Sequence, residues 1–365
     1  MMHAYNALSN RFIRPFISSI SVPNHIAGFD YLRGFAAFVV VIHHIVGMLT
    51  GETRATHHFW VGAAGVDIFF VLSGFLMFGF LAEARPPVQF WIRRLLRVFP
   101  SYFLFTTFAF LVNILILKRD VHFQIWHYTL SLLFIPHINQ LGDLKPIVGA
   151  GWSLVYEFWF YTFIMICLFF RRYRLLIFIA PLFILPVIDY SNKNIAHQFL
   201  GNNVIFEFWL GALSRAVLCI SIKKSYSILM LITGLGVLCA DQFLHLDRDM
   251  NRLFIWGIPA LLIVTSISHM NMASTSVGRF LGDTSYAVYL AHPIFIIGAQ
   301  RFFLKGNPSL IGSAICIGAI VLLTYMTAFF VHKYVDIVAT NKLKKIIFKN
   351  RQNTPLNQYY PAPND

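Results

Sequence analysis

The chain has 365 residues, of which 58% are hydrophobic and only 12% are charged, and its mean hydropathy is +0.66. A soluble domain of this length carries about a quarter charged residues, so water is not the main solvent of this protein. The formal net charge of +14 does not predict a nucleic-acid partner, because the basic residues sit in short loops between apolar segments and form no continuous stripe.

Stretches of about 20 apolar residues recur along the chain, which is the length that an α-helix needs to cross a hydrocarbon core about 30 Å thick. A β-barrel would show shorter segments that alternate apolar and polar residues, whereas residues 309–332 are apolar on every face. The sequence therefore predicts an all-α, polytopic integral membrane protein with about ten transmembrane helices. In chain order we expect them at 30–50, 62–81, 98–117, 152–170, 175–190, 203–220, 227–244, 252–269, 281–300 and 309–332.

The loops predict the orientation of these helices. If ten spans leave both termini on the cytoplasmic side, lysines and arginines concentrate in the cytoplasmic loops, as the positive-inside rule requires. The shorter apolar segment 126–138 then suits an interfacial or re-entrant piece, because an eleventh span would invert every later loop. We expect a cytoplasmic segment at 1–28, a transmembrane domain at 29–340 and a basic, disordered cytoplasmic tail at 341–365, in the inner (cytoplasmic) cell membrane.

The sequence implies neither a disulfide framework nor a metal site. The four cysteines lie singly in apolar segments without CxxC spacing. Candidate functional residues must therefore be sought among polar side chains within the spans, where a charged group costs several kcal/mol unless it is paired or faces a wet cavity.

The first span carries two such side chains, Arg33 and His44. They lie about three helical turns apart, so both occupy one helical face, about 16 Å apart along the axis. This spacing indicates a cation and an imidazole that face one cavity. Alternatively, Arg33 reaches the lipid headgroups and His44 only hydrogen-bonds a neighbouring helix.

The third span begins with two arginines, Arg94 and Arg97, in the segment WIRRLLRVFPSY. Three residues apart, they lie on one helical face at the cytoplasmic end of the span. Two guanidinium groups so arranged bind phosphates through forked hydrogen bonds. Cytoplasmic arginines beside a span are also ordinary topology signals, so the spacing alone leaves both interpretations open.

A carboxylate, Glu157, lies at a depth comparable with that of His44. It could orient the imidazole and raise its basicity, or pair with a distant arginine for packing. Five further polar side chains within spans are candidates for a polar path beside the site, and one of them, Glu207, is more a structural partner than a reactant. These five are Asp67, Ser73, Ser285, His292 and Glu207.

Six motifs in this order resemble the integral-membrane acyltransferase family 3, which includes O-acetyltransferases of O-antigen, exopolysaccharide and nodulation factors. They are LRGFAAFVVVIHH, GVDIFFVLSGFLM, FWIRRLLRVFPSYF, WSLVYEFWFY, FEFWLGA and SYAVYLAHP, and together they span about residues 29–293. The resemblance implies a CoA thioester donor on the cytoplasmic side and a carbohydrate acceptor, often lipid-linked, near the outer face. It implies no tightly bound cofactor.

The family's site residues carry over onto matching positions. The resemblance implies that His44 is the catalytic histidine and that Arg33 is the arginine paired with it in the first motif. It also implies that Arg94 and Arg97, with Arg93 as a companion, bind the donor. The imidazole would act as general base on an acceptor hydroxyl or take the acyl group itself, and both routes stay open.

These observations predict a membrane O-acyltransferase, with acetyl-CoA as the expected donor. The main alternative is a proton-coupled transporter or flippase of a polysaccharide precursor, because intramembrane carboxylates and histidines also serve proton relays. Such a protein should show paired repeats with interrupted helices, and we find no such symmetry in the sequence. A purely structural membrane partner would not need these buried charges.

Overall fold

The computed structural model describes residues 25–50, 59–188, 194–218, 220–244, 251–302 and 310–349, and every regular element in them is helical. The predicted segment 1–28 before residue 25 and the predicted tail after residue 349 lie outside this part of the chain. The long helices are α3 (Ala27–Thr50), α4 (Gly65–Ala82), α5 (Pro87–Leu115), α7 (Trp152–Phe169), α12 (Lys224–Leu244), α15 (Ser276–Phe302) and α16 (Leu310–Val331). The shorter α-helices are α6 (Val121–Leu132), α8 (Arg174–Ile179), α9 (Pro181–Ile184), α10 (Ile195–Leu200), α11 (Val204–Val217), α14 (Ile258–His269) and α17 (Thr340–Lys349). Tighter or wider turns form η2 (Trp60–Ala64), η3 (Gly149–Gly151), η4 (Leu185–Val187), η5 (Leu253–Gly257) and η6 (His332–Ala339).

Seven helices in the described residues are long and apolar enough to cross a membrane. They are Ala27–Thr50, Trp60–Ala82, Pro87–Leu115, Gly149–Phe169, Lys224–Leu244, Ser276–Arg301 and Ile311–Phe348. Two shorter apolar helices, Arg174–Val187 and Leu253–His269, and the 14-residue α11 correspond to the other three predicted spans. The all-α, multi-pass fold class predicted from the sequence is confirmed.

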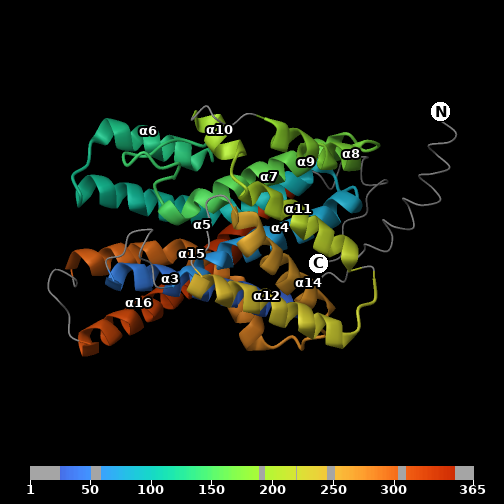
Figure 1. The fold of residues 1–365 in the computed structure, drawn as a ribbon. Helices are drawn as coiled ribbons and strands as arrows, with labels where there is room; N and C mark the ends of the chain where they lie inside the picture. The colour runs from blue at the N-terminus through green and yellow to red at the C-terminus, as the bar shows by residue number, and fades with distance from the viewer. Residues whose placement is uncertain are drawn as a thin grey trace.

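Three predicted segments differ in detail from the structure. The helix predicted over 98–117 begins at Pro87 instead, so the arginines of this segment lie on α5 itself. The segment 175–190 breaks into α8, α9 and η4, because Pro181 and Pro186 each remove a backbone donor and interrupt the helix. Residues 126–132 of the segment 126–138 belong to α6, which is too short to span and lies beside α5 (Figure 1). Thr107 of α5 and Tyr128 of α6 share a 2.9 Å hydrogen bond.

The described part of the predicted tail is a helix rather than a disordered segment. Residues of α17 alternate between apolar side chains, such as Ile347, and lysines. Its Phe348 ring lies 5.0 Å from the guanidinium carbon of Arg93 on α5. The composition of this segment predicted disorder, but one face of the helix packs on a neighbouring helix and stabilises it.

Helices that are distant in sequence pack closely in two pairs, α3 with α15 and α4 with α11 (Figure 1). Glycines make the second pair possible. A Cβ atom added at Gly74 would lie 2.0 Å from the backbone oxygen of Phe208, and one at Gly211 would lie 2.1 Å from that of Val71. Backbones this close leave no room for a side chain, so α11 is fixed against the helix that carries Asp67 and Ser73.

We expect Gly211→Ala to lower the stability of the protein by at least 1–3 kcal/mol, roughly the cost of overpacking, because the added methyl meets backbone atoms that cannot rotate away. The matched control is Gly236→Ala on α12, where no atom lies within 4 Å of the added Cβ. It should be neutral or slightly stabilising. The measurement is the thermal unfolding midpoint of each purified variant, and equal midpoints would refute the close contact.

Candidate functional site

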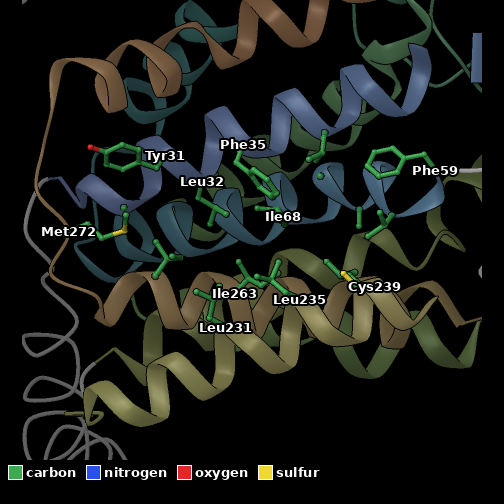
Figure 2. Close-up of a pocket in the computed structure, with 18 residues that line it drawn as sticks. Tyr31, Leu32, Phe35, Phe59, Ile68, Leu231, Leu235, Cys239, Ile263 and Met272 are labelled. Atoms are coloured by element: carbon green, nitrogen blue, oxygen red, sulfur yellow. The ribbon is translucent and has the colours of Figure 1, made fainter. Parts of the chain in front are cut away.

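An apolar groove of about 340 Å³ runs between α3, α12 and α14. Figure 2 shows the aliphatic and aromatic side chains along it, among them Leu32, Leu235 and Ile263. None of its described lining residues is charged or a histidine, and its Tyr31 hydroxyl already bonds the Thr275 hydroxyl at 2.6 Å. The groove offers no charged group among its described lining residues to bind an anion, so the other hollows are better candidates for the chemistry.

A second hollow, of about 80 Å³, lies between α3, α4, α5, α7 and α15, and we call it the arginine cavity. Arg33 of α3 and Arg94 and Arg97 of α5 line it together. The three guanidinium groups are close enough to interact electrostatically with one another. Like charges repel, so gathering them around one hollow is favourable only when anions are supplied to it.

The arginine cavity offers unsatisfied donor capacity as well as charge. The Nε of Arg94 is buried and has no hydrogen-bond partner among the described residues, while its guanidinium lies 4.6 Å from the centre of the Phe80 ring. A single carboxylate, that of Glu157, shares the cavity. It accepts hydrogen bonds from Ser73, at 2.9 Å, and from Tyr161. Three cations and one anion leave an excess of positive charge that suits phosphate groups.

The third hollow is the largest of the three, about 750 Å³, and we call it the histidine chamber. His44 is exposed to it, and the imidazole ring of His44 stacks on that of His292 with ring centres 5.2 Å apart and planes inclined by 18°. The Nε2 of His292 is buried without a hydrogen-bond partner in the described part of the chain. Two stacked imidazoles at a polar cavity can accept and return a proton.

The remaining wall of the histidine chamber combines aromatic rings, amide side chains and the ion pair of Asp143 with Lys145, whose charged atoms lie 3.2 Å apart. His43 also lines it, but its Nδ1 lies 2.7 Å from the carbonyl oxygen of Phe59, which anchors the start of η2. The His43 ring also lies edge-to-face against the His44 ring, with ring centres 4.9 Å apart, so His43 supports both η2 and the position of His44. The aromatic and amide side chains of the wall are Trp60, Trp152, Tyr156, Trp256, Tyr289, Gln198, Asn202 and Gln300.

Val66 and Tyr289 line both the arginine cavity and the histidine chamber and so form the partition between them. The Tyr289 hydroxyl donates to the Ala150 carbonyl at 2.8 Å and shares a 2.9 Å hydrogen bond with Ser153. Arg33 therefore faces one hollow and His44 the other. The prediction that both face a single cavity is wrong. Helical periodicity places Arg33 and His44 on one face of α3, but it does not predict which side chains of α4 and α15 fill the space beside that face.

A comparison with known families decides what kind of protein carries these two hollows. Residues 26–329 match the family model described as an acyltransferase domain, which covers most of the chain. The chain belongs to the acyltransferase 3 family. It is an acyltransferase, and the family predicted from the six motifs is confirmed.

Several curated proteins are similar to this acyltransferase. Exopolysaccharide production protein ExoZ of Rhizobium meliloti is 28% identical over 290 residues, covering 73% of this chain and 88% of ExoZ. O-acetyltransferase OatA of Staphylococcus aureus is 25% identical over 334 residues, covering 78% of this chain but only 53% of OatA. A putative acetyltransferase, ORF330, of Acidianus two-tailed virus is 26% identical over 285 residues, covering 72% of this chain and 80% of ORF330. No solved structure matches the chain.

Of the two roles considered for Glu157 in this acyltransferase, the structure places its carboxylate among the arginines and not beside His44. Its carboxylate lines the arginine cavity and is bound by Ser73 and Tyr161, on the far side of the partition from the histidines. Glu157 is half-buried on α7. The packing of α7 against α4 and α5 decides which side of α7 faces the arginine cavity.

The other predicted residues divide between the two hollows. Ser73 and Ser285 line the arginine cavity, and His292 lines the histidine chamber. Arg93, predicted as a companion in donor binding, does not line the arginine cavity, and its guanidinium lies over the Phe348 ring instead.

Asp67 and Glu207 line neither hollow, and both are 0% exposed. They flank Arg252, which was not among the candidate residues predicted from the sequence. Arg252 lines the histidine chamber and forms an ion pair with Asp67 at 2.8 Å. Asp67 and Glu207 lie within apolar segments, and a buried acid in such a segment needs a cationic partner. A buried cation could therefore have been predicted from these two residues.

Proposed function

We propose that this acyltransferase is an O-acetyltransferase that moves an acetyl group from acetyl-CoA to a hydroxyl of an exported or cell-surface carbohydrate. The donor would bind with its phosphates at the arginine cavity, and the acceptor would bind in the histidine chamber. The observation that carries the proposal is that these two hollows share the partition of Val66 and Tyr289. The names of ExoZ and OatA support a polysaccharide context and O-acetyl transfer.

The residues of the histidine chamber suggest how the acetyl group is transferred. His44 takes the proton of the acceptor hydroxyl while that oxygen bonds to the thioester carbonyl carbon. The carbon–sulfur bond then breaks, and the proton passes from the imidazole to the CoA sulfur. An arginine cavity of about 80 Å³ is too small for a whole acyl-pantetheine arm, so side-chain movement at Tyr289 must admit the thioester to the histidines.

The acceptor chemistry follows from the wall of the histidine chamber. Tryptophan and tyrosine rings offer flat apolar faces with a polar tip, and amide side chains both donate and accept hydrogen bonds. A sugar ring has complementary apolar faces and hydroxyl edges.

We also propose ten spans, with both termini cytoplasmic, in the inner membrane. The seven long helices would be joined by Arg174–Val187, α11 and Leu253–His269 as shorter spans, each within an apolar segment. An even number of spans places both termini on the same side of the membrane, and with ten spans most of the basic loops lie on that side as well. The arginine cavity then opens toward the cytoplasm, where acetyl-CoA is made, and the histidine chamber toward the outside.

The test is mass spectrometry of surface glycans from cells with and without this gene. We expect glycans that differ by whole acetyl units, with unchanged chain length and amount. Purified protein should also transfer label from acetyl-CoA to those glycans. A fall in the amount of exported glycan without a change in its acetylation would instead favour the transporter hypothesis.

Glu157→Gln should change donor binding rather than the chemical step. Glutamine keeps an oxygen that accepts from Ser73 and Tyr161 but removes the only negative charge among the described lining residues of the arginine cavity. We expect the KM for acetyl-CoA to fall, because the anionic donor meets a more positive cavity, while kcat stays within about tenfold. The control is Glu83→Gln, an acid paired with Arg85 outside the cavity. A loss of about a thousandfold in kcat at unchanged KM would instead indicate that Glu157 takes part in proton transfer.

A further inference from the structure

Arg252, which lines the histidine chamber immediately before η5, is held rigid by its neighbours. Its Nε donates to one oxygen of Asp67 at 3.0 Å, and its Nη2 donates to the other at 2.8 Å. The rings of Trp152 and Trp256 lie 5.7 and 4.8 Å from the guanidinium carbon. A forked pair fixes the plane of the guanidinium, and the rings limit its movement, so Arg252 is preorganised before any ligand binds.

Stability alone does not explain this cluster. Asp67 and Glu207 are fully buried, and Glu207 lies 3.9 Å from the Nε of Arg252. The Glu207 side chain is close enough to that of Asp67 to share a hydrogen bond, so two buried acids lie beside one guanidinium. Replacing buried ion pairs by apolar residues is often neutral or stabilising, so such a costly arrangement points to a function of the cation at its centre.

The charge around Arg252 limits what it can bind. Asp67 already balances the guanidinium, and Glu207 adds a second acid behind it. An anionic ligand would therefore gain little net attraction. A neutral oxygen can accept a hydrogen bond from the exposed part of the side chain, which is 22% exposed, without disturbing the pair with Asp67.

We propose that Arg252 determines acceptor specificity by donating a hydrogen bond to a hydroxyl, ring or acetamido oxygen of a neutral sugar. The sugar face lies against Trp152 or Trp256, and a free hydroxyl of the same ring is thereby turned toward His44. This inference rests on the proposed function, because it assumes that the chamber binds carbohydrate. It assigns Arg252 a different ligand from that of the arginine cavity, which receives phosphates.

The test is equilibrium binding of p-nitrophenyl glycosides to the purified protein in lipid nanodiscs. The neutral ligands are the glucoside, galactoside, rhamnoside and N-acetylglucosaminide, and the anionic ligands are the glucuronide and galacturonide. We expect at least one neutral glycoside to bind more tightly than either uronide. Arg252→Lys should weaken its binding about tenfold or more, because lysine keeps the charge but loses the forked geometry. The matched control is Arg119→Lys, an exposed arginine outside the chamber, which should not change binding.

Tighter binding of a uronide, no binding of any neutral glycoside, or equal affinity in Arg252→Lys and the unsubstituted protein would overturn the inference. Binding of a non-hydrolysable acetyl-CoA analogue reports whether each variant is folded, and the comparison of neutral and anionic ligands needs no variant. The same glycosides are then assayed as acetyl acceptors. Binding that depends on Arg252 without acetyl transfer contradicts the proposed function alone. Transfer with an acceptor KM that Arg252→Lys does not raise contradicts this inference alone.

Discussion

His44→Ala should lower acetyl transfer by about 10²- to 10⁴-fold, the usual contribution of a positioned general base. The His44 imidazole is exposed to the histidine chamber and stacks on His292, so its loss removes a proton acceptor that faces the proposed acceptor site. The fold should survive, because an exposed imidazole contributes little to packing. The measurement is transfer of label from acetyl-CoA to glycan by purified protein.

Two other histidines make this experiment specific. His43→Ala should be milder, because its Nδ1 lies against the Phe59 carbonyl and supports η2 rather than the acceptor. His122→Ala, at an exposed position on α6, should leave transfer unchanged. Transfer by the His44→Ala protein within about tenfold of normal would exclude both the general-base and the acyl-histidine routes through His44.

The double variant Arg94→Ala, Arg97→Ala should lose about 10²- to 10⁴-fold in affinity for a CoA analogue. Each charge-assisted hydrogen bond is worth about 1.5–3 kcal/mol, and two of them correspond to this range of dissociation constants. Both residues line the arginine cavity, and the buried Nε of Arg94 has no partner among the described residues until an anion is bound. Isothermal titration calorimetry on detergent-solubilised protein measures the change.

Replacing Arg94 and Arg97 by lysine tests whether the planar geometry of the guanidinium groups contributes to binding of the analogue. Lysine restores the charge but not the planar fork, so the rescue should be partial. Arg279→Ala, an exposed arginine at the start of α15, is the control and should bind the analogue normally. Arg93→Ala should also be mild, because its guanidinium lies on Phe348 outside the cavity. Unchanged affinity in the double alanine variant would remove the arginine cavity from donor binding.

Properties that depend on one segment of the chain could be predicted from the sequence. Each predicted apolar segment is helical, because helix formation in a membrane depends on the side chains and backbone of that segment alone. The pairing of Arg94 with Arg97 on one face follows from the helical period in the same way. The resemblance added the importance of His44, which composition and spacing could not distinguish from an ordinary interface histidine.

The assignment of side chains to cavities depended on contacts between helices that are far apart in the sequence. Asp67 and Arg252 form their ion pair across 185 positions, and Ser73 reaches Glu157 across 84. Hydropathy and periodicity describe a residue and its neighbours on one helix, and they carry no information about which helix docks against it. The sequence by itself therefore determined the helices and the kinds of chemical group they carry. Only the tertiary structure decided that Tyr289 and Val66 separate the arginines from the histidines, because the partition consists of side chains from α4 and α15 that meet only when the bundle is packed.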